Sequence, residues 1–120
     1  MPGALSIGTL SDGTNSTSAT NAIMGSAKAW VNCNGVTTAT IRASYNVSSV
    51  TRNATGDYTV NFTNALADAN YSAVYGGGSS GSNMGRYYSS ATTSAYRFVC
   101  ANTNNATAVD DSQAHVAIFR

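Results

Sequence analysis

The chain offers few side chains that could do chemistry: a single histidine, two cysteines and five acidic residues among its 120 residues. A histidine-based general base or metal site would have to be built around His115. Residues 112–119 alternate, so Ala114, Val116 and Ile118 share one face of a predicted strand. His115 and Phe119 then lie on the opposite face. We expect that face to be exposed to solvent or to form a contact between subunits.

The acidic residues predict no catalytic pair. Asp110 and Asp111 are adjacent, so they point to opposite sides of an extended segment. The chain has no glutamate and its aspartates are scattered, which is poor material for a glycosidase and weak support for a calcium site. Cys33 shares strand parity with Val31, which favours burial over a nucleophilic role. We therefore expect no enzymatic activity, no metal and no cofactor.

Cys33 and Cys100 are too few for a disulfide framework and too far apart for a metal-binding pair. They are interpreted as buried thiols. A bridge between them stays open as an alternative if the chain matures in an oxidising compartment.

Composition excludes two classes of partner. Only 9% of residues are charged and the formal net charge is +1, so no basic patch is large enough for a nucleic-acid backbone. The apolar runs are a few residues long, whereas a membrane-spanning helix needs roughly 20. We expect a soluble chain that binds neither nucleic acid nor membrane.

Apolar residues recur with a period of two, which is typical of half-buried strands. The segment RNATG supplies Asn53 and Gly56, which tolerate a positive φ, so a β-hairpin is predicted over residues 41–63. Trp30 and Phe62 are predicted to be buried. The residues predicted to share one face of each strand of the hairpin are Ile41, Ala43, Tyr45 and Val47, and then Tyr58, Val60 and Phe62.

Further strands are expected near residues 28–33, 69–75, 86–89, 95–101 and 113–119. Good helix formers are scarce, and no segment keeps apolar residues at helical spacing. These features predict an all-β domain, a β-sandwich (jelly-roll-like) of about seven or eight short antiparallel strands. It would occupy residues 27–120, after an extended N-terminal arm over residues 1–26.

The predicted arm joins a short apolar part to a polar one. Leu5, Ile7 and Leu10 offer enough apolar surface to add to a partner, while SDGTNSTSATN after them is polar and cannot enter a core. We predict that Leu5, Ile7 and Leu10 bind a partner.

A second candidate surface surrounds the glycine-rich residues 76–85. Tyr75, Arg86, Tyr87 and Tyr88 flank this segment, and tyrosine and arginine suit recognition because each joins a broad face to a polar tip. Alternatively, about half of these rings fill the core, since Tyr87 and Tyr88 point to opposite faces of any strand.

The ordered run AKAWVN, YNVSS, GDYTVNFT and DANY resembles a β-domain of distal tail fibres and tailspikes of bacteriophages. The resemblance covers roughly residues 25–75, with Cys33 where the family usually has phenylalanine and Ala67 where it often has proline. It implies a non-enzymatic homotrimer on the outer surface of a virion, assembled in the cytoplasm of a bacterial host, and carries over no catalytic residue.

Two functions follow from this resemblance. A capsid cement, or decoration, protein would bind the major capsid protein through its arm. The tip of a tail fibre or tailspike would bind a glycan or protein of the host surface. Fibres with this domain are normally much longer, and 120 residues have room for only an arm and one domain. We therefore expect a cement protein, with the fibre tip as the alternative.

Overall fold

The computed structural model describes residues 3–77, 83–102 and 106–120, with the backbone alone at 83–89. Its N-terminal part holds a short hairpin and helix, β1 (Thr9–Ser11), β2 (Ser16–Ser18) and α1 (Ala19–Gly25). The remaining elements are β3 (Ala27–Asn34), β4 (Thr40–Tyr45), β5 (Val47–Ala54), β6 (Asp57–Phe62), β7 (Ser72–Gly76), β8 (Asn83–Ala91), β9 (Ala95–Asn102) and β10 (Ala114–Phe119).

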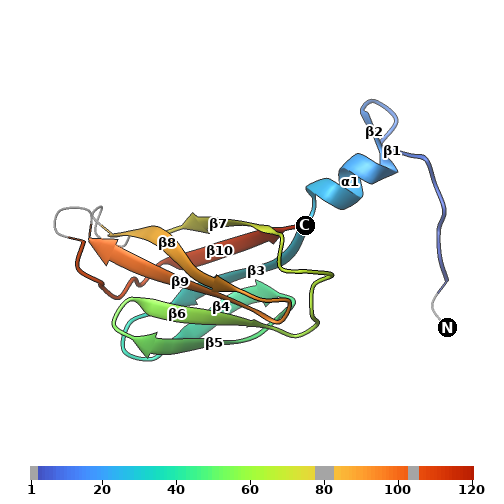
Figure 1. Ribbon diagram of the computed structural model, residues 1–120. Coiled ribbons are helices and arrows are strands. Elements are labelled where there is room, and N and C mark those ends of the chain that lie inside the picture. Colours follow the sequence, from blue (N-terminus) through green and yellow to red (C-terminus); the bar gives the residue numbers. More distant parts are fainter. Residues whose placement is uncertain (1–2, 78–82, 103–105) are drawn as a thin grey trace.

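Eight of these strands form two antiparallel sheets that lie face to face (Figure 1). The first sheet has the order β4-β3-β10-β7 and the second has the order β5-β6-β9-β8. Three pairs of consecutive strands, β3/β4, β5/β6 and β8/β9, stay within one sheet. The all-β class predicted from the sequence is confirmed.

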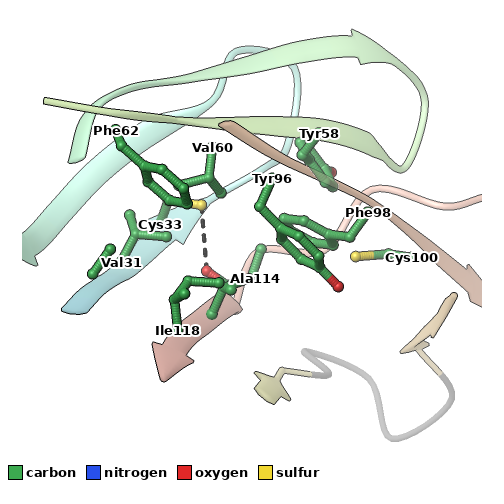
Figure 2. Packing of buried hydrophobic residues seen from close by; sticks show 12 residues of the cluster. Val31, Cys33, Tyr58, Val60, Phe62, Tyr96, Phe98, Cys100, Ala114 and Ile118 are labelled. Carbon is green, nitrogen blue, oxygen red and sulfur yellow. Dashed lines mark hydrogen bonds between the residues drawn. The ribbon is translucent and has the colours of Figure 1, made fainter. Parts of the chain in front are cut away.

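The core lies between the two sheets and is supplied by the inward faces of four central strands (Figure 2). Alternation is regular in β6 and β10, where every second side chain is buried. Burial of Phe62 and of the face containing Ala114 therefore agrees with the prediction. The buried core residues are Ala29, Val31, Cys33, Tyr58, Val60, Phe62, Tyr96, Phe98, Cys100, Ala114, Val116 and Ile118.

The prediction that Trp30 is buried is wrong, because 39% of this residue is exposed. Its neighbours Ala29 and Val31 are both buried, so the pleat of β3 turns the indole to the outer face of the first sheet. The inward parity of Val31 and Cys33 already implied this orientation.

The predicted hairpin over residues 41–63 is wrong in its pairing. Residues 40–45 pair with β3 in the first sheet, and residues 47–54 form a separate strand that pairs with β6. Asn46 has a φ of +53° between them, and its side-chain nitrogen donates to the Lys28 and Asn64 carbonyls at 3.1 Å each. Asparagine tolerates this conformation better than most residues, so the chain can cross between the sheets here.

A β-bulge splits the predicted face of β4. Cys33 pairs with Ile41 but Asn32 pairs with Ala43, which makes Arg42 the extra residue. Ile41 packs against the core, whereas Tyr45 emerges on the outer side with 58% exposure. An inserted residue exchanges the two faces of a strand, and period two alone does not reveal the insertion.

The turn predicted in RNATG does exist, between β5 and β6. Gly56 has a φ of +70°, and a Cβ built there would lie 2.6 Å from both the Cys100 and the Val109 carbonyl oxygens. The position therefore requires glycine for its conformation and for the close approach of two other backbone segments.

The prediction of an extended N-terminal arm is wrong in part, because this segment contains β1, β2 and α1. The Ser18 side chain accepts a hydrogen bond from Asn21 N and caps α1. All residues of β1 and β2 are exposed and none of α1 is buried, which agrees with the prediction that this segment adds nothing to the core. Within the part of the chain that the structure describes, no helix is long and apolar enough to cross a membrane.

Candidate interaction surfaces

The outer face of the first sheet carries an apolar row that crosses all four strands. Trp30 pairs with Tyr45 on one side and with Ala117 on the other, and Ala117 pairs with Val74. Cross-strand partners on one face are close neighbours, so these four side chains form a continuous row. Val74 is 57% exposed and lies near the edge of the molecule. Sequence reasoning missed Tyr45 and Val74 and placed Trp30 in the core.

A groove of about 400 Å³ lies on this face. The small residues Ala117 and Gly76 lie between larger walls formed by Trp30, Val74 and His115. His115 and Phe119, the predicted interface residues, are half-buried and belong to the outward face of β10, as expected.

The second row of this face is polar. Asn32 pairs with His115, and Arg42 Nη1 donates to Asn32 Oδ1 at 3.1 Å while Arg42 Nη2 donates to the Ser112 carbonyl at 2.7 Å. The Nε2 atom of His115 is buried and has no hydrogen-bond partner among the described residues. A positive guanidinium therefore lies in this polar row, beside the apolar row.

The outer face of the second sheet differs sharply, because the described side chains of β5, β6 and β9 bond to one another. Asn61 Nδ2 lies 3.0 Å from Ser49 Oγ and 3.1 Å from Thr51 Oγ1. Arg97 and Asp57 form a bidentate ion pair at 2.9 and 2.6 Å. A face of this kind is well suited to water, whereas the apolar row on the first sheet is typical of a contact surface.

The N-terminal segment is the second uncovered apolar surface. The predicted binding residues Leu5, Ile7 and Leu10 are all exposed, Leu5 by 82%. Ile23 and Met24 of α1 are exposed by 62% and 54%, and sequence reasoning did not identify them. Both lie in a segment whose polar composition concealed a two-turn helix.

A partly buried polar cluster fixes the loop that precedes β10. Arg52 forms a bidentate ion pair with Asp110, whose Oδ1 also accepts from Gly56 N at 2.9 Å and lies 3.0 Å from the Tyr58 hydroxyl. The hydrogen bond from Arg52 is the main reason that the pKa of Asp110 falls to about 2. Asp111 is fully buried and points elsewhere, so the two aspartates form no carboxylate pair.

Tyr75 is a correction to the predicted recognition surface, because its ring packs against Phe98 in the core. Its hydroxyl donates to Asp111 Oδ2 at 2.6 Å and lies 3.0 Å from Cys100 Sγ. Burial, followed by the bond to Asp111, raises the pKa of Tyr75 well above its ordinary value. Of the other three predicted residues, Arg86, Tyr87 and Tyr88, only the backbone in β8 is described; their side chains lie outside the description.

Neither cysteine is placed for catalysis. Both are free and buried, and Cys33 Sγ donates to the Ala114 carbonyl at 3.3 Å (Figure 2). Burial raises the pKa of Cys33 to about 11 and that of Cys100 to about 12. Both thiols are therefore protonated, and poor nucleophiles, at neutral pH.

No group of metal-ligating side chains is found among the described residues. Comparisons with protein-family models, with curated proteins and with solved structures give no match to this chain.

Proposed function

We propose that this chain is a non-enzymatic structural protein of a bacteriophage virion, a homotrimeric cement protein on the outer surface of the capsid. The observation that carries the proposal is the exposed apolar N-terminal segment. Leu5, Ile7 and Leu10 lie outside the core, and the other described residues leave them exposed. Surfaces of this kind belong to proteins that act by binding other proteins.

The asymmetry between the two outer faces supports the homotrimer. Among the described side chains, the second sheet presents polar groups that are hydrogen-bonded to one another, while the first presents Trp30, Tyr45 and Val74. Aromatic residues are enriched in the centres of interfaces. We place the contact between subunits on the outer face of the first sheet, where the predicted interface residues His115 and Phe119 also lie.

The major capsid protein is the proposed partner of the arm. Burying Leu5, Ile7 or Leu10 would contribute roughly 1.5 to 3 kcal/mol each, before the cost of ordering the chain. Three arms on one trimer add avidity, because the first contact raises the effective concentration of the others. The three arms would then link neighbouring subunits of the capsid shell.

The test uses capsids that lack this protein and measures cosedimentation. Deleting residues 2–11 should abolish binding, and the double variant Leu5→Asp/Ile7→Asp should do the same without removing β1. The matched control is Val36→Asp, an exposed valine of the β-domain, which should bind like the native chain. Deleted protein that binds capsids as tightly as the full chain would refute the proposal.

Copy number in purified virions separates this function from the tip of a tail fibre or tailspike that binds a host-surface glycan or protein. Hundreds of copies are expected for a cement protein. A handful, together with full-length protein that ignores capsids, would favour the tail.

A further inference from the structure

We infer that the hairpin and helix of one copy, residues 9–25 (the clasp), dock into the groove on the first sheet of the next copy. This inference rests on the proposed homo-oligomer and names the two surfaces that form it. Leu5 and Ile7 precede the clasp. Leu10 lies in β1 and is not among the residues assigned to the groove, so all three stay available to the capsid.

The clasp needs a partner because it has no core of its own. Its strands are three residues long, its helix has seven residues, and none of those residues is buried. A two-stranded hairpin is marginal in water, and isolated helices shorter than about 12 residues rarely persist. Ile23 and Met24 therefore present uncompensated apolar surface.

The clasp is directed away from its own groove. Figure 1 shows the hairpin and α1 beyond the end of the two sheets, next to the C-terminus. Lys28 Nζ donates to the Ile23 and Ser26 carbonyls, which fixes the short junction between α1 and β3. Trp30 and Val74, the walls of the groove, stay exposed in the same chain. A second copy is thus the occupant that the chain itself can supply.

The groove suits apolar side chains such as Ile23 and Met24, which project from α1 about 100° apart. Its floor is formed at Ala117 and Gly76, and its volume is about 400 Å³. An apolar helix face in an apolar groove is a common mode of recognition. Ile23 and Met24 are neighbours on the last turn of α1, where both are exposed.

The unpaired charges complement each other across this contact. The three ion pairs of the described side chains join Arg52 to Asp110, Arg97 to Asp57 and Arg120 to Asp68. Asp111 is buried, which leaves Asp12 of the clasp as the exposed carboxylate with no cationic partner among the described side chains. Arg42, which borders the groove through its hydrogen bond to Asn32, has no carboxylate partner among them, and neither does Lys28. Docking would bring Asp12 toward Arg42.

Each copy therefore contributes one clasp and one groove, which are different surfaces. Such a head-to-tail contact closes into a ring when the rotation between copies allows it. A homotrimer is the expected ring.

The experiment separates clasp from groove by mixing two variants. Clasp variant Ile23→Asp/Met24→Asp and groove variant Trp30→Ala/Val74→Asp change only exposed residues, so both should keep the circular dichroism spectrum of the native chain. Each should be a monomer of 12.3 kDa by native mass spectrometry. Mixed at equal concentration, they should form a heterodimer, because one intact clasp meets one intact groove.

Four results would overturn the inference. A clasp variant that keeps the native oligomeric mass would show that the clasp is not the contact. A groove variant that keeps that mass would show that the groove is not the contact. A mixture that stays monomeric would show that the clasp does not bind the groove. A native chain that is itself monomeric would overturn the homotrimer as well, while capsid binding is measured separately by cosedimentation.

Charge and specificity have their own controls. Asp12→Asn keeps the oxygen that accepts hydrogen bonds from Thr14 N and Asn15 N but removes the charge. At low salt, its oligomer should therefore dissociate at a higher protein concentration than the native oligomer. At high salt, the two should dissociate at the same concentration. Val36→Asp should leave the oligomer intact. Equal dissociation of Asp12→Asn and the native chain at low salt would remove Asp12 from the contact.

Discussion

At the scale of single residues, Asp110 joins three parts of the chain. It binds Arg52 of β5, the Gly56 amide in the next turn and the Tyr58 hydroxyl of β6. The loop before β10 is thereby fixed to the second sheet. Because β10 carries His115 and Phe119 on its outer face, this partly buried cluster helps to set the position of the proposed interface.

The Asp110 cluster predicts a specific loss of stability in acid. The carboxyl has a pKa of about 2 when folded, against 3.8 as a reference, so its contribution is fully present above pH 4 and is lost as the pH falls toward 2. With allowance for partial exposure, about 1 to 2 kcal/mol should disappear over this window. Urea unfolding between pH 2 and 5 should show this slope, and Arg52→Gln should flatten it. An unchanged slope in Arg52→Gln would contradict the assignment.

Phe62 and Trp30 form a matched pair on opposite faces. In the monomeric clasp variant, Phe62→Ala should lower the free energy of unfolding by about 3 to 5 kcal/mol, because it empties a core site. Trp30→Ala should cost clearly less there, since 39% of this residue is exposed and no enclosed core site is emptied. Denaturant midpoints measure both. Equal losses would mean that the outer face is already covered within one chain.

At the scale of elements, irregularities decide which side chains reach the surface. The bulge at Arg42 turns Tyr45 outward beside Trp30, and the positive φ of Asn46 sends the chain to the second sheet. Both features position the apolar row. Neither contributes a side chain to the core.

The turn between β5 and β6 predicts a strong preference for glycine. Gly56→Ala should destabilise the domain by at least about 1 kcal/mol, because the conformation is strained for alanine and Cβ would clash with two carbonyls. Gly3→Ala is the control, since nothing lies within 4 Å of its Cβ position and it lies outside the clasp. Thermal melting compares them, and a neutral Gly56→Ala would show that the turn relaxes.

Alternation made much of the fold predictable, and its interruptions account for the failures. The inward faces of β6 and β10 follow directly from period two, so Phe62 and Ala114 are in the core as predicted. Strand pairing was not predictable, because residues 41–47 look equally suited to either sheet. Tyr75 was mistaken for a surface residue because its buried partner, Asp111, is 36 residues away. The exposed apolar residues Ile23 and Met24 were not identified, because the sequence around them is polar.

At the scale of the whole molecule, the chain is a two-sheet domain with a projecting clasp (Figure 1). Among the described side chains, the outer face of the second sheet is polar, whereas that of the first carries the apolar row. Its described ion pairs are few and partly exposed, so its stability should depend little on salt. The low charge also leaves apolar burial as the main source of binding energy. We therefore expect assembly to survive high ionic strength.

The central claim is that this chain acts by assembling through its uncovered apolar surfaces. Native mass spectrometry of the unmodified protein at micromolar concentration tests it most directly. The predicted result is a single species at three times the 12.3 kDa of the chain, retained in high salt. A stable monomer under these conditions would contradict the account.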